Sequence, residues 1–182
     1  MHIAQGIIIA LLFLPFLDSF EFYLVVFFPC IIDLDFLFSG TVKNKNHRRL
    51  ITHSLLPYLV LAALGFIYPL FFILGLCGVV HLFIDVIDWG TALLAPFYKD
   101  PIGGILPDVP TSLLSESNFK QRQCWFTKTY YNSWIIRITE VGFGIFTIAL
   151  ILIINAQYIW LMGFYFLLLA FHLSYYLRCR RK

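Results

Sequence analysis

One apolar stretch, residues 77–90, carries three potential metal ligands and constrains the protein more than any other part of the sequence. At helical spacing His81, Asp85 and Asp88 fall at i, i+4 and i+7, so their side chains project from one face of a helix. Burying ionisable groups among apolar residues is costly unless they are paired or bind a metal. We therefore expect a metal-binding stripe. The alternatives are that His81 and Asp85 form a hydrogen-bonded pair joining two helices, and that Asp88 is a solvated helix end.

The stretch lies in a chain whose composition is typical of membrane proteins. Hydrophobic residues make up 60% of the 182 positions and charged residues 13%, against the roughly 25% charged residues of soluble domains. Apolar runs cover residues 3–17, 22–38, 55–66, 70–96, 138–154 and 158–177. They predict an all-α fold, a polytopic integral membrane helical bundle with about six segments in three hairpins. The first and third runs are shorter than the ~20 residues that cross a bilayer comfortably.

The basic residues indicate how this bundle is oriented. All 13 lysines and arginines lie in residues 43–49, 99–137 and 178–182, and none lies in the short turns between hairpin partners. Because Lys and Arg accumulate on the cytoplasmic side, we expect a multi-pass protein of the inner or plasma membrane with both termini cytoplasmic. The basic residues form no tract, which argues against nucleic-acid binding. The N-terminus has no basic region or cleavage site of a signal peptide, so we expect the first apolar run to remain in the mature protein.

Three regions follow from these patterns. Residues 1–98 hold the ligand motifs within a membrane-embedded catalytic core, residues 99–133 read as a cytoplasmic or interfacial loop, and residues 134–182 form a transmembrane hairpin with a basic tail. The four cysteines, at positions 30, 77, 124 and 179, form no C-x-x-C pair. We therefore expect them to be reduced or inert rather than part of a disulfide framework.

Further ligand candidates fall on the same side of the membrane as the stripe. Asp33 and Asp35 end the second apolar run, and His53 begins the third. The expected metal ligands are Asp33, Asp35, His47, His53, His81 and Asp85. Oxygen and imidazole ligands without a thiolate suit Zn, Mn or Mg, as one ion or two. Asp33 and Asp35 cannot share one helical face, so the helix opens there or only one of them is a ligand.

Hydrolysis is the chemistry that such a set suits, because a metal with an open position activates water and polarises the attacked group. Asp33 or Asp88 could serve as the general base. Arg48 and Arg49 could bind a phosphate bidentately, which favours a lipid-phosphate or phospholipid substrate. The alternative is that they are ordinary basic residues of a cytoplasmic loop or contact lipid headgroups. Thr52 and Ser54 flank His53 and could orient its ring or cap a helix.

The order of these motifs also resembles a known family. Ile32-Asp-Leu-Asp35, Arg48-Arg-Leu-Ile-Thr-His-Ser54 and His81-x-x-x-Asp85, followed by Gly90 and Pro96, are similar to the motifs of the YdjM-type membrane-bound metal-dependent hydrolases. The resemblance covers about residues 1–98. It implies that Asp33, Asp35, His53, His81 and Asp85 bind metal, with Arg49 and Thr52 in support. His2 matches a histidine near that family's N-terminus.

Two other classes of function fit parts of the pattern. A transporter or ion-binding channel would use the same carboxylates and imidazoles to pass a metal ion or protons. A non-catalytic scaffold would recruit partners through residues 99–133. We favour the enzyme because the candidate ligands gather at one side of the membrane, whereas a carrier site is expected near the midplane.

Overall fold

The computed structural model describes residues 1–41, 47–98, 100–107, 109–113 and 119–181. Apart from one antiparallel bridge between Thr91 and Ile102, the described residues form helices, turns and loops without strands, so the all-α prediction is confirmed. The α-helices are α1 (His2–Leu12), α2 (Ser19–Asp33), α3 (Leu55–Ala63), α4 (Pro69–Asp88), α5 (Phe119–Asn132), α6 (Trp134–Ile154) and α7 (Leu161–Arg180). Short 3-10 helices, η2 (Leu34–Thr41), η4 (His47–Arg49), η5 (Ile51–His53), η6 (Leu64–Phe66) and η9 (Ala156–Trp160), extend or join them.

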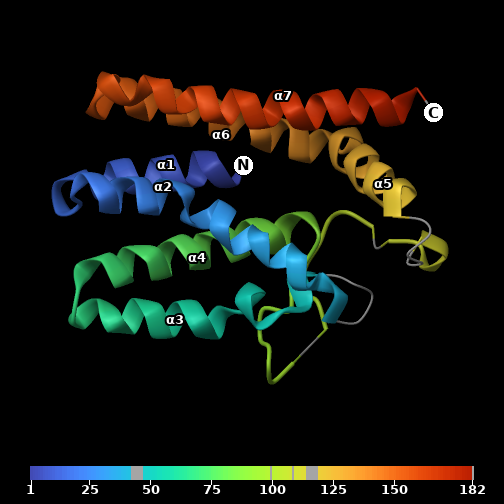
Figure 1. The fold of residues 1–182 in the computed structure, drawn as a ribbon, viewed down its shortest axis with the longest axis horizontal. Coiled ribbons are helices and arrows are strands. Elements are labelled where there is room, and N and C mark those ends of the chain that lie inside the picture. The colour runs from blue at the N-terminus through green and yellow to red at the C-terminus, as the bar shows by residue number, and fades with distance from the viewer. Residues whose placement is uncertain (42–46, 99, 108, 114–118, 182) are drawn as a thin grey trace.

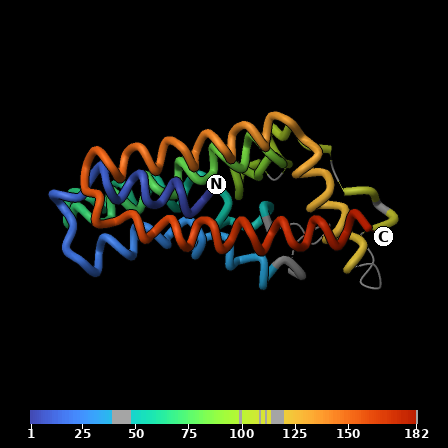
Figure 2. The backbone as a smooth tube through the Cα atoms, turned by 90° about the horizontal axis from the view of Figure 1, so that it is seen from above, coloured from blue at the N-terminus to red at the C-terminus, as the bar shows by residue number. Residues whose placement is uncertain are grey.

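Three antiparallel hairpins stack side by side, with α1 and α2 between the α3–α4 pair and the α6–α7 pair (Figure 1). The long axes of all six helices run in nearly the same direction (Figure 2). All three hairpin turns lie at one end of the bundle, which we call the turn end. The loops, α5 and the C-terminus lie at the other, which we call the site end.

Only some of the apolar runs form helices long enough to cross a membrane. Within the described residues the candidate spans are Pro69–Asp88, Trp134–Ile154 and Ala156–Arg180. The helices at His2–Leu12 and Leu55–Phe66 are apolar but shorter. The prediction of about six membrane segments is thus not confirmed, because two of the runs are too short and the second leaves α-helical geometry after Asp33.

Glycine contacts hold the α3–α4 hairpin close together. A Cβ at Gly75 would clash with the backbone of α3, and one at Gly78 would clash with the ring of Tyr58. Small residues let helices approach closely where the hydrophobic effect cannot drive them together. The Tyr58 hydroxyl, held over Gly78, donates to the carbonyl of Thr52 at 2.5 Å. The close approach therefore fixes the turn that carries His53.

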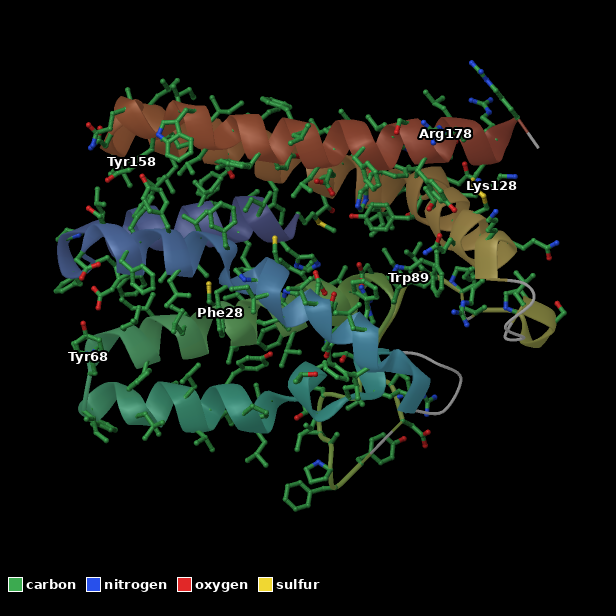
Figure 3. The ribbon with its side chains drawn as sticks, in the orientation of Figure 1. Phe28, Tyr68, Trp89, Lys128, Tyr158 and Arg178 are labelled. Atoms are coloured by element: carbon green, nitrogen blue, oxygen red, sulfur yellow. A yellow bond between two sulfur atoms is a disulfide. The ribbon has the colours of Figure 1, made fainter. Side chains whose placement is uncertain are left out.

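Capping and aromatic residues mark the turn end. Asp18 and Glu21 form a capping box at the start of α2, which satisfies two free backbone N–H groups. The hydroxyl of Tyr68 donates to the carboxylate of Glu21 and ties two hairpins together. Tyr68 and Tyr158 lie at this end, whereas Trp89, Lys128 and Arg178 lie at the other (Figure 3). Aromatic residues at both ends are typical of a membrane protein's two interfaces.

Two expectations for the C-terminal half need correction. The segment expected to be a loop, residues 99–133, contains the 14-residue helix α5, which packs against α7. The cysteines were expected to be reduced or inert, but Cys124 of α5 and Cys179 of α7 form a disulfide, while Cys30 and Cys77 are free. The two cysteines are 55 residues apart and meet only because α5 folds back, so their spacing could not reveal the bond.

Candidate metal centre

Four side chains from three separate elements converge at the site end of the bundle. Asp33 ends α2, His53 ends η5, and His81 and Asp85 lie one turn apart on α4. One ligand atom from each lies within 4.8 Å of the others. Nε2 of His53 is 3.6 Å from Asp33 Oδ1 and 3.3 Å from Asp85 Oδ2. Nε2 of His81 is 3.5 Å and 3.3 Å from the same two oxygens. We call these four residues the metal cluster.

The spacing fits the ligands of one cation. Ligands bonded at about 2.0–2.2 Å in a tetrahedron stand about 3.3–3.6 Å apart. The four nitrogen–oxygen distances, 3.3 to 3.6 Å, fall in this range. His81, Asp85 and Asp88 are all buried, and of these three residues of the predicted stripe His81 and Asp85 belong to the metal cluster.

His81 supplies the clearest sign that a ligand is expected. Its side chain is fully buried, and among the described residues neither ring nitrogen has a hydrogen-bond partner. An unsatisfied buried polar group costs about 1–3 kcal/mol. A cation bonded to Nε2 would remove part of that cost, so the residues present fit a bound metal ion.

Asp35 lies beside the cluster rather than in it. The helix opens after Asp33 into η2, and Asp35 contacts Nδ1 of His53 at 2.8 Å, on the opposite side of the ring from the cluster. Thr52 donates its hydroxyl to the same carboxylate. A carboxylate on the far nitrogen of a metal-binding histidine orients the ring and raises its basicity. Of the two aspartates, Asp33 faces the cluster and Asp35 positions His53.

Thr91 holds the segment before α3 against the end of α4, and the sequence analysis missed it. Its hydroxyl lies 3.0 Å from the carbonyl oxygen of Arg48 and 2.8 Å from that of His53. The chain reaches this position because Gly90 takes a φ of +74°, which reverses it directly after α4. A buried threonine after a helix-ending glycine was the only sequence signal.

Arg48 pairs with two carboxylates of α4. Its guanidinium lies 2.5 Å from Asp88 Oδ1 and 3.0 Å from Asp85 Oδ1. Asp88 also accepts a hydrogen bond from the backbone N–H of Trp89 at 2.6 Å. Asp88, expected as a possible general base or a solvated helix end, is thus buried and paired. Burial lowers the pKa of Arg48, but the charges of Asp85 and Asp88 outweigh burial and raise the pKa above its ordinary value.

The other cationic groups have different surroundings. Burial lowers the pKa of His53, but its contacts with Asp33, Asp35 and Asp85 have the larger effect and raise the pKa to about 11. A metal ion at Nε2 of His53 would therefore compete with a proton for that nitrogen. Arg49 approaches Asp100 at 3.8 Å and points to the loop after α4. The side chain of His47 lies outside the described part of the structure, as do Lys43, Lys45, Lys99 and Lys182, so the prediction that His47 is a ligand stays a prediction.

A cavity of about 390 Å³ borders the cluster. Asp33, whose side chain is 35% exposed, faces it together with His2, Arg48 and Asp88. Nε2 of His2 lies 3.8 Å from Asp33 Oδ2 and 3.7 Å from Asp85 Oδ1, and its ring centre is 4.2 Å from that of His81, with the two rings tilted by 38°. The cluster is therefore closed by protein on most sides and reached past Asp33 and His2.

Glu140 and His172 also line the cavity, outside the metal cluster. The carboxylate of Glu140 accepts hydrogen bonds from the Met1 ammonium at 2.8 Å and from the Tyr130 hydroxyl at 3.0 Å.

The chain matches no protein-family model, no curated protein and no solved structure. The site is therefore interpreted from its own geometry.

The contact between Asp35 and His53 gives a testable expectation. Asp35→Asn keeps the shape of the side chain but weakens its hold on the imidazole, so metal affinity should fall about 10- to 100-fold. Isothermal titration with Zn²⁺ on the purified protein measures this. Asp100→Asn, which alters an exposed carboxylate, is the control. Unchanged metal affinity in Asp35→Asn would show that Asp35 does not position His53 for metal binding.

Proposed function

We propose that this protein is an integral membrane metal-dependent hydrolase that acts on a phosphoester or lipid-like substrate. The observation that carries the proposal is the metal cluster: two imidazoles and two carboxylates at the spacing of one ion, beside a cavity. A divalent cation held there would polarise the attacked group and lower the pKa of a water molecule. The likeness of the motifs to the YdjM-type hydrolases supports the same reaction class.

The chain's own residues divide the remaining tasks. Asp33 borders the cavity and is partly exposed, so it is better placed than Asp88 to accept a proton from water. Asp88 is held by Arg48 and by a backbone N–H. The guanidinium of Arg48 also borders the cavity, where it would attract an anionic ester. Arg49 is a weaker candidate for this role because it points to Asp100.

The proposal is tested by assaying purified protein in phospholipid micelles after loading with Zn²⁺, Mn²⁺ or Mg²⁺. Phosphomonoester and phosphodiester lipids are the substrates. We expect phosphate or headgroup release that stops when a chelator strips the metal and returns when the metal is restored. Asp33→Asn should abolish turnover, whereas Asp100→Asn should not. Metal-loaded protein that hydrolyses none of these lipids would contradict the proposal.

Transport of a metal ion is the second candidate, and the depth of the cluster favours it. His81 and Asp85 lie about 18 and 24 Å along α4 from Pro69, inside a hydrocarbon core of about 30 Å. Carrier sites lie near the midplane. Metal flux into proteoliposomes that requires Asp85, without lipid hydrolysis, would favour this reading over the enzyme.

The proposed location is the inner or plasma membrane, with the site end at the cytoplasmic face. The bias of basic residues supports this orientation, and Lys128 and Arg178 lie at that end (Figure 3). The Cys124–Cys179 disulfide lies at the same end and counts against this orientation, because disulfides are rare in the reducing cytoplasm.

A further inference from the structure

The cavity lies beyond the N-terminal end of α1. This helix has 11 residues, against 20 in α7. The N-terminus lies about midway along α7, so α1 covers only the half of the bundle nearest the turn end (Figure 1). Met1, His2 and Ile3 form one boundary of the cavity.

The walls of the cavity differ in polarity. The wall next to the metal cluster carries Asp33 and Arg48. On the side of α7, Leu168 and Leu169 form an apolar part of the lining next to His172, and Phe126 of α5 closes the site end by packing against Trp89, at a ring distance of 4.9 Å. A ligand that satisfies both walls needs an anionic group joined to an apolar one.

The apolar wall lies at hydrocarbon depth. Leu168 is at the middle of the candidate span Ala156–Arg180. It is 44% exposed, and His172, one turn further along the same face, is also exposed. On the facing wall, Cys30 of α2 is half-buried. Because this wall is exposed at the middle of a membrane span, it would contact lipid chains rather than water.

We infer that a membrane phospholipid enters this cavity sideways from the bilayer between α2 and α7, with its ester phosphate toward Asp33 and Arg48 and an acyl chain along Leu168 and Leu169. The inference deepens the proposed function and rests on it for the reaction. A phospholipid is the occupant that matches a wall that would attract an anion once a metal ion is bound, an apolar part of the lining and an opening at hydrocarbon depth. Water-soluble phosphoesters match only the first.

Filling the apolar wall tests the inference. Full-length metal-loaded protein is reconstituted in vesicles of phosphatidylethanolamine and phosphatidylglycerol, released into detergent, and analysed for retained lipid by native mass spectrometry. We expect one retained phospholipid in the wild type and about tenfold lower occupancy in Leu168→Trp, because the indole takes the space of the acyl chain. Leu167→Trp is the matched control, since Leu167 is 66% exposed and does not line the cavity. Cys30→Trp fills the space from the facing wall and serves if Leu168→Trp does not fold.

The outcomes separate this inference from the proposed function. Metal content is measured in every variant and should stay at the wild-type value. Lipid retained by the wild type, displaced by Leu168→Trp or Cys30→Trp and never hydrolysed would support the cavity inference and count against the hydrolase. Wild-type lipid retention in folded, metal-loaded Leu168→Trp and Cys30→Trp would overturn the cavity inference. If the same variants also hydrolysed water-soluble esters, the hydrolase proposal would hold although the cavity inference had failed.

Discussion

His81→Leu is expected to abolish metal binding without unfolding the protein. Leucine fills nearly the same volume. The contacts of His81 Nε2 with Asp33 and Asp85, at 3.5 and 3.3 Å, are lost, but His53 contacts the same two oxygens, so the metal-free fold should lose little. The thermal midpoint of the metal-free variant should stay close to that of the metal-free wild type. The free energies of unfolding of the two should differ by no more than about 1 kcal/mol. One of four ligands is gone, however, so the remaining set should not hold the ion.

Metal-dependent stabilisation is the readout that separates these effects. A ligand present at 100 times its Kd stabilises the folded state by about 2.7 kcal/mol. The wild type should show such a shift in thermal midpoint with Zn²⁺, and His81→Leu should show none. His172→Leu, on an exposed part of α7, should behave as the wild type does. Full metal occupancy in His81→Leu would mean that the histidine only packs between helices.

Arg48→Met is expected to cause the largest loss of stability. The substitution keeps the length of the side chain but leaves Asp85 and Asp88 buried without their cation. Removing one partner of a buried ion pair costs about 3–5 kcal/mol. The neighbouring Arg49→Met is a matched control, because Arg49 pairs at 3.8 Å with an exposed carboxylate and exposed pairs contribute about 0–1 kcal/mol.

A second substitution tests the electrostatic origin of that loss. Arg48→Met combined with Asp88→Asn removes one of the two stranded charges and should recover part of the stability. Metal affinity should not fall in Arg48→Met, because the lost positive charge had opposed the binding of another cation. Equal stability of Arg48→Met and Arg49→Met would show that the buried pairs contribute nothing and would leave substrate binding as the role of Arg48.

Helical periodicity explains what could be predicted. Because side chains at i and i+4 share a face, the sequence alone places His81 and Asp85 together. Asp88 was placed on that face too, but its pairing with Arg48 was not foreseen. That contact depends on Thr91, which pulls the chain at residue 48 against the end of α4, and local pattern carries no information on such long-range contacts.

The limits of the same reasoning appear at Asp33 and Asp35. Their spacing showed that a regular helix could not present both to one ion, and the change from α2 to η2 between them resolves the conflict. Which of the two would face the cluster depended on where His53 came to lie. The cavity was also beyond prediction, because side chains of α1, α2, α5, α6 and α7 line it together and no single motif brings them together.

X-ray absorption spectroscopy of the metal-loaded protein tests the central claim most directly. Purified protein is supplemented with Zn²⁺, desalted and measured at the zinc edge. If Asp33, His53, His81 and Asp85 hold the ion, the spectrum should show two imidazole ligands with nitrogen at about 2.0–2.1 Å and oxygen in the remaining positions. A protein that retains no metal, or a spectrum without imidazole scattering, would contradict the account.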